Sequence, residues 1–220
     1  ALDPAKDVDG ITQGSLYGVF ANQPVGFPPC TADACMQVLK HYGYELSGAN
    51  VTVLGRSLVI GKPVSMMLQA RNATVTMCHS KTQNLPEITR QADILVVAIG
   101  KPEFVTADMV KEGAVVVDVG IHRVADASKK NGYRVIGDVK HSEVDSKCSW
   151  VTPVPGGVGK MTIAMLMMNT VEAQISSAKM VKNTGQAFLR NWGISSAAKR
   201  MAKPPMQCSE GQTLVLVSTV

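Results

Sequence analysis

The sequence is short of aromatic residues and of long hydrophobic runs. Its longest apolar stretches, such as residues 94–99 (ILVVAI), have the length of a β-strand and are far too short to cross a bilayer. No basic segment followed by an apolar one opens the chain, which argues against export and favours a cytoplasmic protein that is not held in a membrane. The cysteines lack metal-ligand spacing, so we expect reduced thiols and no metal site.

Positive charge is in excess only near the end of the chain. The formal net charge is +5, and acidic and basic residues balance over residues 1–175. The excess therefore lies in the tail, whose one acidic residue is Glu210 and whose basic residues are Lys179, Lys182, Arg190, Lys199, Arg200 and Lys203. Because the tail lacks the interleaved aromatic residues on which bases stack, the sequence argues against nucleic-acid binding and favours a solvated helix or a loose end.

Short β-branched runs alternate with helical stretches between residues 50 and 120. The runs that read as strands are 50–54, 73–78, 93–99 and 114–119, and the stretches that read as helices are 61–70, 85–91 and 106–112. The strands are mostly apolar on both faces, which indicates a sheet covered by helices on each side. Strand–helix–strand repetition predicts parallel crossovers, so the fold class is α/β with a doubly wound, Rossmann-like parallel sheet. Helical stripes also predict helices over 31–42 and 161–176.

The first predicted strand leads through residues 55–61 (GRSLVIG) directly into a helix. Free N–H groups and the helix dipole at such a point attract phosphates. Gly55 would permit a sharp turn, and Gly61 would let the helix pack closely on the sheet. A regular G-x-G-x-x-G is absent, because Ser57 and Ile60 occupy its second and third glycine places, so a plain structural turn remains an alternative.

The end of the second predicted strand carries no carboxylate. A site that prefers NAD places an acid about 20 residues after the first glycine, to accept the ribose hydroxyls. Here the chain reads Cys-His-Ser-Lys over residues 78–81. An extra phosphate on the ribose would meet Ser80 and the guanidinium of Arg56, so the sequence favours NADP as the cofactor.

A further glycine follows the fourth predicted strand, at Gly120-Ile121. Ligands of such folds sit at the carboxyl edge of the sheet, so this backbone could approach a nicotinamide ring. The alternative is a strand that simply leaves the sheet at this point.

Several segments, taken in their order from about residue 3 to about residue 175, carry a family resemblance. They are KDVDG at 6–10, PPCT at 28–31, the turn at 55–63, ATVT at 73–76 with HSKT at 79–82, and TPVPGGVG at 152–159. Together they resemble the methylenetetrahydrofolate dehydrogenase/methenyltetrahydrofolate cyclohydrolase family. The resemblance implies NADP-dependent oxidation of 5,10-methylenetetrahydrofolate to the methenyl form, hydrolysis to 10-formyltetrahydrofolate in the complete protein, and a homodimer.

The resemblance also implies roles for matching residues. Asp9 would contact the folate, and Pro155, Gly156 and Gly159 would line its cleft. The NADP contacts would be Gly55, Arg56, Ser57 and Ile121, with Ser80 beside Arg56 at the extra phosphate. The catalytic lysine would lie on a Tyr-x-x-x-Lys helix of a front domain that this sequence does not contain, so no catalytic residue is assigned.

This resemblance divides the chain into four parts. Residues 1–30 would be a hinge segment, 31–160 the NADP-binding domain, 161–180 a C-terminal helix and 181–220 a tail. Lys160 stands where the family usually has proline. The last helix would present an apolar face that packs on the front domain in the family, so we expect exposed apolar surface there.

Three other functions remain open at this point. The chain alone could be a non-catalytic NADP-binding module. A two-domain dehydrogenase acting on an amino or hydroxy acid would share the fold, although the loop at 153–159 argues against it. A nucleic-acid-binding role that rests on the tail comes last.

Overall fold

The computed structural model describes residues 2–191, with side chains as far as Lys179. It contains two compact units: one ends at Gln174, and the other begins at Ile175 within helix α6 (Val158–Asn191). The expectations for the basic tail fall mainly on residues 192–220, which lie outside the described residues.

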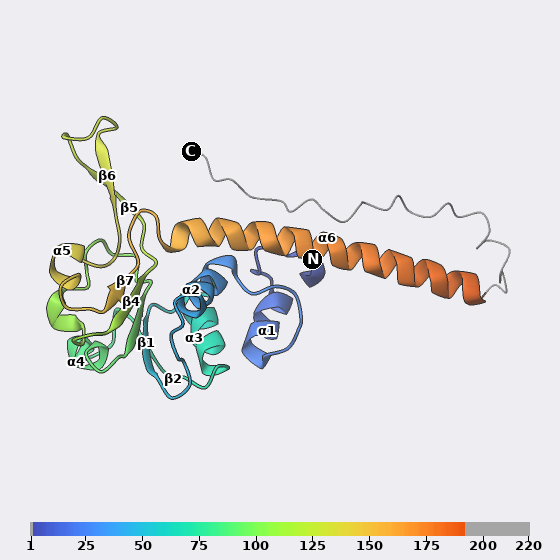
Figure 1. Cartoon of the computed structure of the whole chain (residues 1–220), viewed down its shortest axis with the longest axis horizontal. Coiled ribbons are helices and arrows are strands. Elements are labelled where there is room, and N and C mark those ends of the chain that lie inside the picture. The colour runs from blue at the N-terminus through green and yellow to red at the C-terminus, as the bar shows by residue number, and fades with distance from the viewer. Residues whose placement is uncertain (1, 192–220) are drawn as a thin grey trace. The chain divides into compact units, whose positions relative to one another are not determined.

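A five-stranded parallel sheet forms the centre of the first unit (Figure 1). Its order is β2-β1-β3-β4-β7, and its strands are β1 (Asn50–Leu54), β2 (Thr74–Cys78), β3 (Ile94–Val97), β4 (Val115–Asp118) and β7 (Trp150–Val151). The crossovers contain α3 (Gly61–Gln69), α4 (Leu85–Thr89) and the 3-10 helix η2 (Ala107–Met109). β2 pairs with one side of β1, and the chain then crosses to the other side of β1 to form β3, as in doubly wound folds. The predicted fold class is therefore confirmed.

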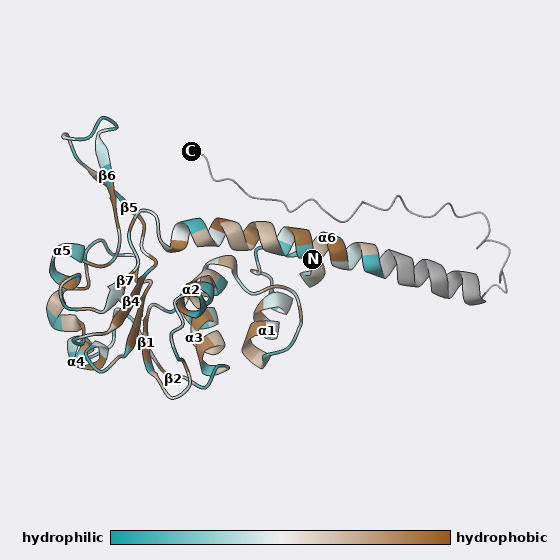
Figure 2. Cartoon of the chain, viewed as in Figure 1, coloured by the Kyte–Doolittle hydropathy of each residue, from teal (hydrophilic) through white to brown (hydrophobic). Residues whose placement is uncertain are grey.

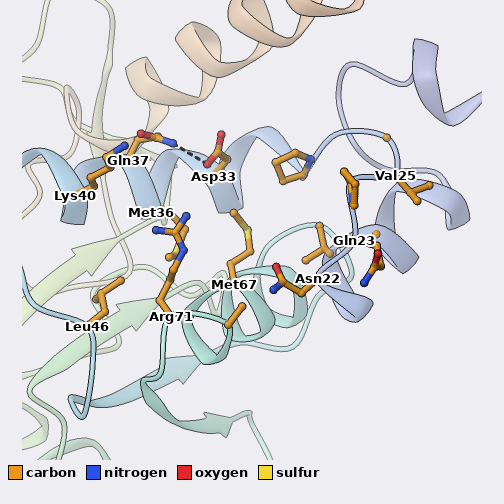
Figure 3. A pocket seen from close by; sticks show the side chains of 16 residues that line it. Asn22, Gln23, Val25, Asp33, Met36, Gln37, Lys40, Leu46, Met67 and Arg71 are labelled. Carbon is orange, nitrogen blue, oxygen red and sulfur yellow. Dashed lines mark hydrogen bonds between the residues drawn. The ribbon is translucent and has the colours of Figure 1, made fainter.

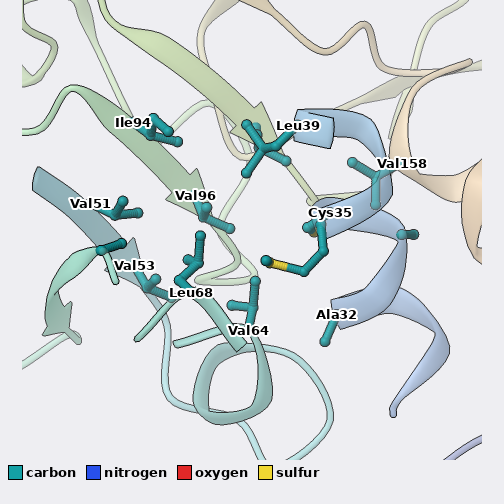
Figure 4. Packing of buried hydrophobic residues seen from close by; sticks show 14 of the residues in the cluster. Ala32, Cys35, Leu39, Val51, Val53, Val64, Leu68, Ile94, Val96 and Val158 are labelled. Atoms are coloured by element: carbon teal, nitrogen blue, oxygen red, sulfur yellow. The ribbon is translucent and has the colours of Figure 1, made fainter. Parts of the chain in front are cut away.

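Each face of the sheet buries its own apolar cluster, because alternate residues of a strand point to opposite sides. On one face, Val53 and Val96 pack with Leu68 of α3 and Leu39 of α2 (Cys30–His41), as Figure 4 shows. On the other face, Leu54, Leu95, Val97 and Val116 pack beneath α4, η2 and the short helix α5 (His141–Val144). Figure 2 shows the strands as largely hydrophobic ribbons between the two layers of helices. Burial on both sides explains why β1, β3 and β4 lack polar alternation, whereas the edge strand β2 alternates between exposed threonines and less exposed apolar residues.

Several elements were not predicted from the sequence. They are the 3-10 helix η1 (Pro4–Lys6), helix α1 (Gln13–Ala21), helix α5, the edge strand β7 and the antiparallel hairpin of β5 (His122–Ala125) and β6 (Tyr133–Ile136). The buried carboxylate of Asp7 organises the entry to α1 by accepting hydrogen bonds from Gly10 N, Thr12 N and the Ser15 hydroxyl. Burial raises the pKa of Asp7, but these hydrogen bonds outweigh it and hold the pKa below its usual value.

The described part of α6 within the first unit is apolar on more than one side. Met165 is buried against the cluster around α2, whereas Ile163, Met167 and Val171 are exposed. Figure 2 shows these hydrophobic turns along the helix. The expected exposed apolar surface is therefore present. Among the described helices, none is long and apolar enough to cross a membrane.

Candidate functional site

The loop at residues 55–61 leaves the carboxyl edge of the sheet beside the end of β2. Leu54 is the register partner of Cys78, and Gly55 N donates a hydrogen bond to Cys78 O over 2.9 Å. Gly55 has a φ of 137°, and a side chain there would collide with the carbonyl of Ala98. A side chain at Gly61 would collide with the Gly55 carbonyl in turn. Both glycines therefore act as expected, one allowing the turn and the other the close packing of α3.

Ser57 organises the start of α3. Its hydroxyl oxygen accepts hydrogen bonds from Ile60 N at 3.1 Å and Gly61 N at 3.3 Å, which satisfies two backbone donors at the helix start. The hydroxyl proton is still free to be donated to an acceptor above the loop. The local geometry therefore offers an anion a hydroxyl donor at the positive end of a nine-residue helix.

Arg56 and Ser80 follow the ends of two paired strands. Arg56 comes two residues after Leu54 and Ser80 two residues after Cys78, and these two strand ends are in register. Arg56 and Ser80 are exposed, as is the neighbouring Lys81. The structure thus brings the two predicted phosphate ligands to the same edge of the sheet, in a locally cationic environment with no acidic residue between 71 and 86.

The residues predicted to line the folate cleft lie next to the predicted nicotinamide contact. Pro155, Gly156, Gly159 and Ile121 line one cavity of about 310 Å³. A Cβ atom on Gly159 would lie 3.2 Å from Ile121 Cδ1, so glycine at this position leaves room for the isoleucine side chain. Ile121 is 62% exposed, and its side chain is therefore available to a ligand.

Asp9 does not line this cavity. It is exposed and lies beside Cys30, whose N–H donates to Asp9 O over 3.4 Å. Burial and the neighbouring Asp9 carboxylate raise the pKa of the Cys30 thiol to about 11. Asn169 of α6 donates to Val8 O over 2.9 Å and so fixes this segment to the helix. The cavity beside Ile121 therefore includes Pro155, Gly156 and Gly159, and Asp9 is not among its lining residues.

Sequence reasoning missed the buried carboxylate of Asp118, at the end of β4. Its oxygens accept hydrogen bonds from Gly120 N, Asp138 N and Val139 N over 2.9 to 3.0 Å. Its backbone exchanges hydrogen bonds with the Thr152 hydroxyl, which ties the loop at 152–159 to β4. Burial raises the pKa of Asp118 above its usual value, although the three backbone donors oppose the shift. The only sign of this role in the sequence is that Asp118 directly follows three valines at 115–117.

A second cavity of about 270 Å³ lies between α1, α2 and α3 (Figure 3). Its polar side chains include Asp33, Lys40 and Arg71, and Gln37 donates to Asp33 over 3.2 Å. Because Leu46 and Arg71 precede β1 and β2, this cavity reaches the amino edge of the sheet, away from the residues predicted to bind the cofactor. Within residues 2–191, no group of three or more histidine, cysteine and acidic side chains is arranged to hold a metal ion.

Residues 29–178 match the family model described as "Tetrahydrofolate dehydrogenase/cyclohydrolase, NAD(P)-binding domain". The chain is 58% identical over 177 residues to the bifunctional protein FolD of Cytophaga hutchinsonii, and the match covers 79% of this chain and 61% of that protein. It is 53% identical to the cytoplasmic C-1-tetrahydrofolate synthase of Spodoptera frugiperda, covering 79% of this chain and 18% of the relative.

A solved structure with a similar fold is the FolD enzyme of Trypanosoma brucei in complex with NADP and an inhibitor. It aligns with a TM-score of 0.76 at 39% identity, covering 80% of this chain and 61% of that one. The FolD enzyme of Campylobacter jejuni aligns with a TM-score of 0.73 at 44% identity, covering 78% and 59%. The chain therefore spans about 60% of the length of the FolD proteins it matches.

Proposed function

Because the chain belongs to the tetrahydrofolate dehydrogenase/cyclohydrolase family through its NAD(P)-binding domain, we propose that it binds NADP and presents it to a tetrahydrofolate substrate. In the complete protein the reaction is oxidation of 5,10-methylenetetrahydrofolate to the methenyl form, followed by hydrolysis to 10-formyltetrahydrofolate. The observation that carries the proposal is the meeting of two features at one edge of the sheet. These are the glycine loop at 55–61 and the cavity beside Ile121.

The residues of the loop fit a dinucleotide phosphate. Gly55 and Gly61 let the loop pack against the Ala98 carbonyl and its own backbone without collision, and Ser57 holds a proton available for donation. Arg56 and Ser80 provide a guanidinium and a hydroxyl for the extra phosphate that distinguishes NADP from NAD. When bound, NADP supplies the carbon that accepts the hydride, so the task of the protein is to position the two reacting carbons.

The cavity at Pro155, Gly156 and Gly159 fits the substrate side of the same reaction. Ile121 lines the same cavity, and glycine at position 159 leaves room for its side chain. Asp9 would reach the folate from the segment beside α6, rather than from within this cavity. A rigid backbone wall is suited to hydride transfer, which needs close positioning more than acid–base assistance.

Hydrolysis of the methenyl bridge needs an activated water and a group of tuned pKa. No residue of this chain is assigned that role, because the family's lysine belongs to its front domain. The second candidate function is therefore a non-catalytic NADP-binding module, which the partial coverage of the relatives favours for this chain taken alone. We further propose a cytoplasmic location, a homodimeric complete protein, and the division of the chain into parts at 1–30, 31–160, 161–180 and 181–220.

Calorimetric titration of the purified chain with NADP and with NAD tests the proposal. We expect measurable NADP binding that is tighter than NAD binding, because only NADP offers the phosphate to Arg56 and Ser80. Equal affinities, or a preference for NAD, would refute the assignment of the cofactor. The same preparation should show negligible hydrolysis of methenyltetrahydrofolate, and fast turnover would show that the catalytic group lies within this sequence.

A further inference from the structure

A second buried carboxylate, Asp138, links two loops at the carboxyl edge of the sheet. Its Oδ2 atom accepts hydrogen bonds from Ile99 N and Gly100 N, both over 2.8 Å. Its Oδ1 atom lies 2.6 Å from Nε2 of His122. The carboxylate is 0% exposed, so these contacts replace water completely.

The two linked segments flank the site proposed for the nicotinamide. Ile99 and Gly100 follow β3, whereas His122 begins β5 directly after Ile121. The strands β3 and β4 are neighbours, with Val97 in register with Asp118. A side chain on Gly120 would collide with the backbone and carboxylate of Asp138, so the loop after β4 is packed directly against this anchor.

Among the described side chains, His122 is the only one able to carry a positive charge that contacts Asp138. No lysine or arginine in residues 2–179 forms an ion pair with this carboxylate. An ionised carboxylate can only accept hydrogen bonds, so in this contact Nε2 of His122 is the donor. Asp118 and His141 belong to the same buried group. His141 Nε2 lies 3.7 Å from Asp118 Oδ2 without a hydrogen-bond partner, and its Nδ1 atom contacts Asp145 at 3.0 Å.

We propose that His122 is a positioning residue for the cofactor, which acts through Asp138 to hold Ile121 and the Ile99–Gly100 loop at a fixed separation. This inference rests on the proposed function, because the two loops matter to affinity only if the dinucleotide lies between them. His122 itself contacts the carboxylate and not the cofactor. Its effect is to keep the wall of the nicotinamide site in place before the ligand arrives, which lowers the ordering cost of binding.

Affinity measurements with a matched set of variants test this role. His122→Ala removes the donor and should weaken NADP binding about tenfold, as expected when a buried charge-assisted hydrogen bond is lost. His122→Gln keeps an N–H near the position of Nε2 and should remain within about threefold of the wild type. His41→Ala, at the end of α2, is the control histidine and should bind as the wild type does. Far-UV circular dichroism checks that each variant is folded.

Amide hydrogen exchange without cofactor tests the same role independently of NADP. In His122→Ala the Ile99 and Gly100 amides should exchange about tenfold faster, whereas the Val139 amide, which donates to Asp118, should change little. Unchanged exchange at Ile99 and Gly100, wild-type affinity of His122→Ala, or a Gln variant as weak as the Ala variant would each overturn the proposal. A wild-type chain that binds no NADP would instead overturn the proposed function, while exchange would still report whether His122 holds the loops.

Discussion

The loop after β1 and the loop after β4 reach the same edge of the sheet by different means. Residues 55–61 depend on the space left by glycines and present Arg56 to solvent. Residues 118–122 depend on two buried carboxylates: Asp118 accepts from three backbone amides, and Asp138 accepts from two and contacts His122 with its other oxygen. The first loop is therefore suited to choosing a ligand by charge, and the second to fixing where that ligand lies.

Selectivity for NADP over NAD and the position of the bound cofactor should therefore depend on different residues. Changes to exposed groups of the first loop should alter the preference between NADP and NAD with little effect on stability, because solvated charges contribute little to folding. Changes to the buried carboxylates should lower stability and weaken both cofactors alike, because they act on the backbone that both would touch. The following substitutions test this distinction.

Asp118→Ala should have the largest effect. It leaves Gly120 N, Asp138 N and Val139 N without their acceptor, and we expect a loss of about 3–5 kcal/mol in the free energy of unfolding. Urea denaturation followed by circular dichroism measures it. Asp126→Ala is the control, because Asp126 accepts side-chain hydrogen bonds only from Ser128 in its own turn and should cost less than about 1 kcal/mol. Similar costs for both variants would show that Asp118 is not an anchor.

Gly55→Ala should lower the free energy of unfolding by about 3 kcal/mol and abolish measurable NADP binding. The new methyl group meets the Ala98 carbonyl, and the residue must also hold a φ of 137°. Gly43→Ala is the matched control, because Gly43 also has a positive φ but open space around it, and should cost only about 1 kcal/mol. A Gly55 variant that is no less stable than the Gly43 variant would rule out the close approach.

Arg56→Ala should weaken NADP binding by about 10- to 30-fold and NAD binding by less than about threefold, because the lost contact is charge-assisted and specific to the extra phosphate. Calorimetry with both cofactors gives the two ratios. Arg71→Ala, which removes an arginine from the cavity at the opposite edge, should leave both affinities unchanged. An equal loss of NADP and NAD affinity would mean that Arg56 supports the loop and does not select the cofactor.

Lys160→Pro should have the smallest effect. Lys160 lies in the first turn of α6, where proline is tolerated, and the change removes only the hydrogen bond from Lys160 N to Gly157 O at 3.1 Å. We expect the free energy of unfolding to stay within about 0.5 kcal/mol and NADP affinity to stay the same. A loss above about 1.5 kcal/mol would indicate that the lysine N–H shapes the loop at 152–159.

The sequence predicted four of the five strands of the central sheet, because β1, β3 and β4 are buried on both faces and read as nearly continuous apolar runs. It missed β7, which is only two residues long. It did not predict the hairpin of β5 and β6, whose strands contain no buried residue and contribute none to the two apolar clusters. Helix α1 was missed because its apolar residues do not gather on one side. Its start is instead fixed by Thr12 and by the carboxylate of Asp7, which precedes the helix.

The candidate site was predictable where backbone conformation depends on a residue type. Gly55 and Gly61 could be identified because a strand that enters a helix through glycines has few geometric solutions. Asp118, Asp138 and His122 could not, because their roles arise from contacts between segments about 20 residues apart that share no local pattern. The roles of Asp9 and of the cofactor contacts remain predictions, and the binding experiments address those of Gly55 and Arg56.

The two buried carboxylates interlock with two glycines, since Gly120 lies against Asp138 and Gly137 lies against Asp118. Each acid occupies the room that a side chain on the opposing glycine would need. In a library of random point substitutions, positions 120 and 137 should therefore accept glycine alone. A variant with a larger residue at position 120 or 137 would also need a smaller residue in place of the facing aspartate. We therefore expect substitutions at each glycine and its facing aspartate to occur together.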